Sequence, residues 1–140
     1  MQKSTDELTN QIKKTDNIED FINSNKTNLL TKSISELLND FLERKNLSRG
    51  EVAKESDVHR TYVYEIFNGK KVPSRDKMIA VGFGLKLDFD EMQKLLKQSG
   101  YRELYSRDSR DSVIIFALNK GKNLLECNEL LYSLSEELIK

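Results

Sequence analysis

Residues 47–74 constrain the fold most, because this stretch carries several helix start and stop signals at close spacing. Ser48 stands three residues before Glu51, which is the pattern of a capping box that opens a helix. Asp57 follows at the point where the chain must turn, and Asp tolerates the left-handed backbone of a sharp turn. Asn68-Gly69 then ends a second helix in the manner of a left-handed C-cap. The stretch therefore predicts two short helices joined by a tight turn.

The pattern of apolar residues indicates which face of the second helix is buried. Ala53 in the first helix is small enough to let the second helix cross close above it. The second helix has one apolar stripe: Val58, Tyr62 or Val63, and Ile66. Its polar residues are left to point outward: His59, Arg60, Thr61, Tyr64 and Glu65. So polar an outer face on a short helix indicates a surface that binds a partner.

This stretch resembles the helix-turn-helix of the bacterial and phage repressors related to lambda repressor, Cro and Xre. The resemblance covers roughly residues 33–98, and the positions that carry it agree in one register: Leu47-Ser48, Glu51-Val52-Ala53, Val58, Arg60, Tyr62-Val63, Ile66, Asn68-Gly69-Lys70 and Pro73-Ser74. It implies an all-α, five-helix repressor-like helix-turn-helix domain. It also implies a DNA-binding regulator in which the helix at about 59–67 enters the major groove. Some members of the family bind proteins instead of DNA.

The chain departs from the family pattern at positions that bear on the partner. Arg49 stands where the family often has a Gln that touches the DNA backbone, and His59 replaces a capping Ser or Thr. Asp57 occupies the usual position of a turn Gly, and Glu65 occupies a base-reading position where members often carry Gln or Arg. These two acidic residues favour the alternative function, a protein-interaction module (an adaptor or antitoxin-like protein) that uses the same fold.

The predicted DNA-binding residues combine the outer face of the second helix with basic residues around it: Arg49, His59, Arg60, Thr61, Tyr64, Glu65, Lys70 and Lys71. In this hypothesis, Arg60 donates two hydrogen bonds to O6 and N7 of a guanine, and Glu65 accepts one from N4 of a cytosine. Further phosphate contacts are expected from Arg44, Lys45 and Arg75. The predicted partner is double-stranded DNA.

Composition limits the other classes of function. Lys+Arg and Asp+Glu both number 23, so the formal net charge is zero and any basic footprint must be local. A single cysteine, Cys127, excludes an internal disulfide, and no Cys/His cluster predicts a metal site. No Ser/His/Asp set or Gly-rich phosphate loop occurs, so we expect neither an enzyme nor a cofactor. With no signal-peptide core and no apolar run longer than 113–118, we expect a cytoplasmic protein and no membrane segment.

Three more helices complete the predicted domain at residues 33–100. Ser33 and Glu36 form a capping pair that opens the first, and Asp88 and Glu91 form one that opens the last. Ser74 caps the helix between the turn and that last helix.

Gly82 and Gly84 lie inside the helix that Ser74 caps. A glycine within a helix costs about 1 kcal/mol relative to alanine, so a second role is expected for the pair. They either permit a close helix crossing, or they loosen the helix or end it early.

Residues 1–32 are predicted to form a polar N-terminal arm. Ile18, Phe21 and Ile22 are spaced to form about one and a half helical turns, started by Asp16 or Asn17. The arm either is frayed and packs loosely or not at all, or it wraps a partner subunit or reaches along DNA.

Residues 101–140 are predicted to form an Arg/Tyr connector and a helical hairpin. The connector, 101–111, either lines a nucleic-acid backbone or is a loop whose arginines pair with Glu103, Asp108 and Asp111. Helices are predicted at 112–120 and 123–139. The apolar residues of the second step by three and four along one seam: Leu124, Cys127, Leu131, Leu134 and Leu138. The hairpin has more apolar surface than it can bury alone, so it packs either on the N-terminal helix bundle or on another copy of the chain. The resemblance implies a homodimer through this hairpin.

Overall fold

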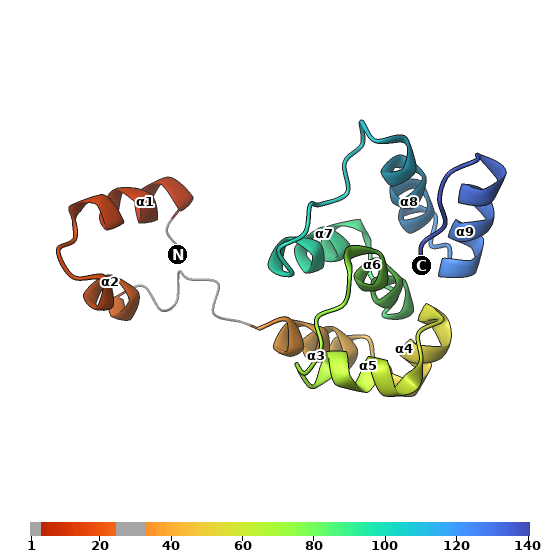
Figure 1. Cartoon of the computed structure of the whole chain (residues 1–140), viewed down its shortest axis with the longest axis horizontal. Helices are drawn as coiled ribbons and strands as arrows, with labels where there is room; N and C mark the ends of the chain where they lie inside the picture. Colours follow the sequence, from red (N-terminus) through yellow and green to blue (C-terminus); the bar gives the residue numbers. More distant parts are fainter. Residues whose placement is uncertain (1–3, 25–32) are drawn as a thin grey trace. The chain divides into compact units, whose positions relative to one another are not determined.

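The computed structural model describes residues 4–24 and 33–140, and it divides the chain into two compact units, 1–33 and 34–140. The described residues fold into α-helices and turns without a strand (Figure 1), which confirms the predicted all-α class. The first unit holds α1 (Thr5–Lys14) and α2 (Ile18–Ser24). The second holds α3 (Ile34–Arg44), α4 (Arg49–Ser56), α5 (Arg60–Phe67), α6 (Arg75–Gly84), α7 (Phe89–Gln98), α8 (Ser109–Asn119) and α9 (Leu124–Ser133).

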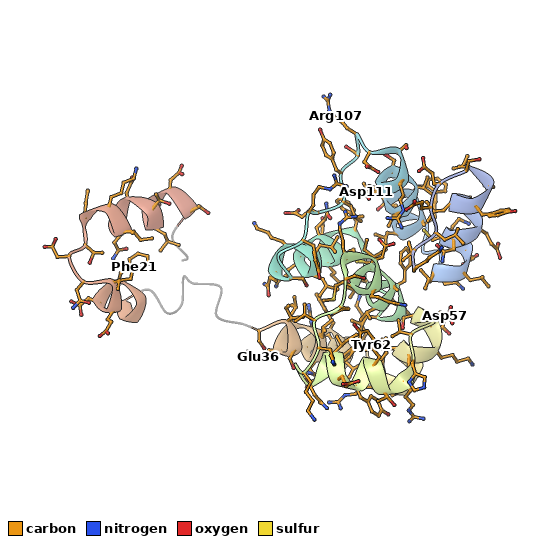
Figure 2. The ribbon with its side chains drawn as sticks, viewed as in Figure 1. Phe21, Glu36, Asp57, Tyr62, Arg107 and Asp111 are labelled. Atoms are coloured by element: carbon orange, nitrogen blue, oxygen red, sulfur yellow. The ribbon has the colours of Figure 1, made fainter. Side chains whose placement is uncertain are left out.

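The first unit contains a helix that the apolar pattern did not predict. The α1 helix begins where the Ser4 side chain accepts a hydrogen bond from the backbone N–H of Glu7 at 3.2 Å. Acidic residues occupy its first turn and basic residues its last, which complements the helix dipole. In α2, whose position was anticipated at residues 18–22, Phe21 is buried (Figure 2). The remainder of the predicted arm, 1–3 and 25–32, lies outside the described residues.

One apolar core runs through the second unit from α3 to the C-terminal segment. Its largest fully buried side chains come from the five helices α3 and α5 to α8: Leu37, Leu38, Phe41, Ile66, Phe67, Met78, Ile79, Leu95, Leu96 and Ile114, with Leu85 and Met92. The α8–α9 hairpin contributes to this same core through Ala117, Cys127 and Leu131. It is therefore part of the folded body that carries α4 and α5.

The two glycines of α6 permit close helix crossings, which is the first of the alternatives left open by the sequence. A Cβ atom at Gly84 would lie 2.8 Å from the backbone oxygen of Val52 in α4, too close for any real contact. A Cβ atom at Gly82 would overlap the flexible end of the Met92 side chain in α7. The α6 helix also ends at Gly84, so the last glycine serves both the crossing and the helix end.

The α8 helix begins at Ser109, three residues before the predicted start. The carboxylate of Asp108 accepts a hydrogen bond from the backbone N–H of Asp111 at 2.9 Å and caps the helix there. This bond, together with nearby arginines, lowers the pKa of Asp108 below its ordinary value, against a smaller opposing effect of burial. The cap was overlooked because the connector was interpreted as a run of Arg and Tyr up to residue 111.

The α9 helix ends at Ser133, so the prediction of a helix to residue 139 was wrong. Ser135 has a left-handed backbone (φ 58°), which turns the chain back along the helix. The Asn128 side chain then accepts from the N–H of Ile139 at 2.8 Å and donates to its carbonyl oxygen at 3.3 Å. The predicted seam is therefore buried only at Leu124, Cys127 and Leu131, whereas Leu134 is 59% exposed.

Candidate nucleic-acid interface

The turn between α4 and α5 is built from local hydrogen bonds. The Ser48 side chain caps α4, because its oxygen accepts a hydrogen bond from the backbone N–H of Glu51 at 3.1 Å. The Glu51 carboxylate accepts from the Ser48 hydroxyl, whereas in a full capping box it would accept from the Ser48 backbone N–H. Asp57 takes the left-handed conformation predicted for it, with φ 54°. His59 then caps α5, because its Nδ1 accepts from the N–H of Thr61 at 3.2 Å.

The inner face of α5 fixes the helix on the core. Val63, Ile66 and Phe67 are buried, while Tyr62 is only partly buried, so Val63 is the residue of the predicted stripe. The carbonyl oxygen of Phe67, at the end of α5, accepts hydrogen bonds from Ser35 and Asn39 of α3 at 2.5 and 3.0 Å. The buried inner face and the two bonds from α3 thus hold α5 on the core.

The outer face of α5 presents the polar side chains that were predicted to lie there. His59, Arg60 and Thr61 are exposed at its N-terminal end. Tyr64 and Glu65 are partly buried in its middle. Figure 2 shows α5 on the surface of the second unit, with side chains projecting away from the core.

Two arginines lie against the ring of Tyr64. The Arg60 guanidinium carbon is 5.5 Å from the ring centroid, and Arg60 Nε donates to the Tyr64 hydroxyl at 3.0 Å. The guanidinium carbon of Arg49, from the first turn of α4, is 5.7 Å from the same centroid. Tyr64 therefore brings together one cation from each helix of the motif.

The loop after α5 brings two lysines to its C-terminal end. The backbone N–H groups of Lys70 and Lys71 both donate to the carbonyl oxygen of Glu65, at 2.9 and 3.3 Å. Both lysines are exposed. The predicted set thus gathers on one surface around α5, with Arg49 and Arg60 at one end and Lys70 and Lys71 at the other.

Two of the basic residues expected to touch phosphate have partners elsewhere. Arg75 donates to the Asp111 carboxylate at 3.0 Å and to the carbonyl oxygens of Arg102 and Glu103 at 2.8 and 3.2 Å. Lys45 forms an ion pair with Glu91 at 2.8 Å. Each cation is therefore used to hold the fold, and its contact with phosphate stays a prediction.

The connector is a packed loop, as the second of its two interpretations states. Leu104 is buried, the Tyr101 hydroxyl donates to the carbonyl oxygen of Pro73, and Arg102 lies 3.5 Å from the Asp111 carboxylate. In Figure 2, Arg107 lies at the end of the second unit opposite α5, so this arginine is not part of the surface around that helix.

Arg110 joins the connector to the C-terminal tail. It donates to both carboxylate oxygens of Asp76 in α6, at 3.2 and 2.8 Å, and to the carbonyl oxygens of Glu137 and Leu138 at 2.9 and 3.0 Å. Partial burial opposes its charge, but the hydrogen bond and charge of Asp76, together with the charges of Asp111 and Glu137, outweigh it and raise the pKa of the guanidinium. No local pattern in the sequence indicates this pairing, and the arginines of the connector were expected to pair within it.

Gly50 is the residue near α5 that sequence reasoning missed. A Cβ atom placed there would lie 3.6 Å from Nη2 and 3.7 Å from Cζ of Arg60, so the Arg60 guanidinium lies near this part of α4 and the glycine leaves space beside it. Spacing within α4 does not say which of its residues faces α5, and no local pattern marks this glycine.

The described residues give little support to three other possibilities: a reactive thiol, a metal site and a membrane-spanning helix. Burial raises the pKa of the Cys127 thiol to about 11, against a smaller effect of Arg110, so the thiol is protonated at neutral pH and a poor nucleophile. Within 4–24 and 33–140, no group of three or more His, Cys, Asp or Glu side chains is placed to hold a metal ion. No helix of this described part is long and apolar enough to cross a bilayer.

Comparison with known proteins places α4 and α5 in a family. Residues 38–92, from within α3 to within α7, match the family model described as Helix-turn-helix. Neither a curated protein nor a solved structure matches the chain. The matched segment contains the two capped helices, the left-handed turn and the outer face described above. The chain therefore carries a helix-turn-helix domain of the lambda repressor, Cro and Xre type, a DNA-binding class of regulatory domain.

Proposed function

We propose that the protein is a sequence-specific transcription regulator that reads the major groove of duplex DNA with α5. The observation that supports this most is the grouping of polar and basic side chains around one firmly held helix. Arg60 at the start of α5 and Glu65 in its middle supply base contacts of opposite polarity, one donating and one accepting. Arg49, Lys70 and Lys71 lie at the two ends of this face, where phosphates flank the groove.

The zero net charge of the chain is compatible with this function because the cations are concentrated. Lys45 and Arg75 are neutralised by internal ion pairs. In contrast, Arg49 and Arg60 lie against the neutral ring of Tyr64. Their charges remain available to phosphate and base acceptors.

Binding to duplex DNA across a salt series tests the proposal. Each phosphate contact releases a counterion, so log K is expected to fall steeply with log salt. Lys71→Ala should weaken binding to all sequences alike and reduce the magnitude of the salt slope by about one. Lys86→Ala is the control, since Lys86 is an exposed lysine beyond α6 and outside the predicted set. Absence of binding at low salt, or equal effects of both substitutions, would count against the proposed interface.

The same proposal includes a homodimer formed through α9. Leu125, Tyr132 and Leu134 are 68%, 79% and 59% exposed, which is unusual for large apolar side chains. Leu125 and Tyr132 are about two helical turns apart and border a shallow groove of about 280 Å³ that is also lined by Asn128, Glu129 and Leu138. In a two-fold interface, the same patch meets itself, so Tyr132 of each copy enters the groove of the other.

Tyr132→Asp is expected to convert a dimer into a monomer, because the interface would bury an unpaired carboxylate. The mass in solution, measured by light scattering, should fall by half. Tyr105→Asp is the matched control, since Tyr105 is half exposed on the connector, away from α9. A wild-type protein that is monomeric at high concentration, or equal masses for wild type and Tyr132→Asp, would refute the dimer.

A protein-interaction module is the second candidate, and the carboxylate of Glu65 favours it. This partly buried acid sits in the middle of the outer face of α5, where it repels phosphate and attracts basic side chains. On this alternative, α5 docks a protein partner. The salt series separates the two, because the protein would then bind no duplex DNA at low salt.

A further inference from the structure

We infer that Tyr64 is a positioning residue for the base contact made by Arg60. The inference rests on the proposed function and adds to it a determinant of specificity that touches no base. Tyr64 and Arg60 are four residues apart on α5, so their side chains lie on the same face of the helix. The hydroxyl of Tyr64 accepts from Arg60 Nε at 3.0 Å, and the ring lies beside the guanidinium.

Gly50 of α4 leaves room for the Arg60 side chain beside the first turn of that helix. An ideal Cβ at this position would be 3.6 Å from Nη2 and 3.7 Å from Cζ, which is ordinary van der Waals contact. The guanidinium therefore has the hydroxyl of Tyr64 at Nε and the first turn of α4 beside Nη2. The hydrogen bond and the ring contact to Tyr64 favour one among the many rotamers that an exposed arginine can adopt.

The hydrogen bond from Arg60 Nε to Tyr64 determines which N–H groups of Arg60 remain to donate to DNA. A guanidinium can meet two acceptors either through Nε and one terminal amino group or through both terminal amino groups. With Nε engaged by Tyr64, the remaining pair is Nη1 and Nη2, which have no hydrogen-bond partner among the described residues. Arg60 thus meets O6 and N7 of a guanine end-on. Because the rotamer is already selected, less conformational freedom is lost when DNA binds.

Selection from a random duplex library tests this role. We compare wild type, Tyr64→Phe, Arg60→Ala and the double variant, with Tyr105→Phe as the matched control on the connector. Tyr64→Phe keeps the ring between Arg49 and Arg60 but removes the acceptor for Nε. Preference for guanine at the position read by Arg60 should fall by about fivefold, the usual effect of one hydrogen bond. Preferences at the other positions and the melting temperature should be unchanged.

The double variant distinguishes positioning from general structural support. In the Arg60→Ala background, Tyr64→Phe should have no further effect on base preference, because Tyr64 acts only through Arg60. A structural role would instead lower the affinity for every sequence and lower the melting temperature in both backgrounds.

The experiment distinguishes failure of the positioning role of Tyr64 from failure of the proposed function. If wild type selects a consensus and Arg60→Ala relaxes one position, but Tyr64→Phe behaves like Tyr105→Phe, the positioning role of Tyr64 is overturned while the proposed function stands. Additive effects of the two substitutions on base preference overturn it as well. If wild type binds no duplex DNA at low salt, the proposed function itself is overturned.

Discussion

Asp111→Ala is expected to lower the free energy of unfolding by about 3–5 kcal/mol, the usual result of removing one partner of a buried ion pair. The Asp111 side chain is 1% exposed. Its carboxylate accepts from Arg75 at 3.0 Å and from the backbone N–H of Tyr105 at 3.0 Å, and it lies 3.5 Å from Arg102. The substitution leaves a largely buried guanidinium and a backbone donor without their acceptor, and neither regains full contact with water.

Urea unfolding of the variant and its controls measures this loss, provided that the m-value is unchanged. Asp111→Asn retains the shape and one acceptor oxygen, so it should be less harmful than alanine. Glu43→Ala removes an exposed carboxylate from α3 and should change stability by less than about 0.5 kcal/mol. A loss for Asp111→Ala no larger than that of Glu43→Ala would mean that the ion pair contributes nothing to the fold.

Arg60→Ala is expected to cost about 1–3 kcal/mol of binding free energy on the preferred DNA site and to relax selection at one base position. Arg60 lies at the exposed start of α5, where a guanidinium can reach O6 and N7 of a guanine. Binding to the selected site and to a site with that one base changed gives the loss directly.

Glu65→Gln complements this variant on the same helix. Glu65 lies five residues after Arg60, about 140° further around the helix, and accepts well from the N4 amine of cytosine. Removing its charge should strengthen nonspecific binding, because repulsion from phosphate disappears, while it blurs selection at a second position. An identical consensus for wild type, Arg60→Ala and Glu65→Gln would show that α5 does not select bases.

The elements that could be predicted from sequence depend on contacts over a few residues. Ser74 accepts from Lys77, and Asp88 and Glu91 exchange the two bonds of a full capping box. Asp57 turns the chain as expected. Such signals place the helix-turn-helix and the outer face of α5 because the cap, the turn and the apolar stripe all lie within one short stretch.

The remaining features depend on contacts between distant parts of the chain. Arg75 meets Asp111 across 36 residues and Lys45 meets Glu91 across 46, so neither cation is distinguishable in sequence from a free phosphate-binding residue. In the α9 region, the apolar spacing continues to Leu138, but the bonds between Asn128 and Ile139 favour a returning tail over a longer helix. The spacing of apolar residues along the sequence cannot show which of these two structures, the returning tail or the longer helix, is more stable.

Arg75 and Asp76 are neighbours in the first turn of α6, yet they hold different parts of the C-terminal segment. Arg75 binds the connector through Asp111 and two carbonyl oxygens, while Asp76 binds Arg110, which in turn holds the tail. The helix-turn-helix domain is consequently not modular in this protein. A chain cut after α7, or a graft of α3–α7 onto another body, would leave two adjacent opposite charges without their partners. Recombination or engineering that exchanges the C-terminal segment must therefore change residues 75 and 76 with it.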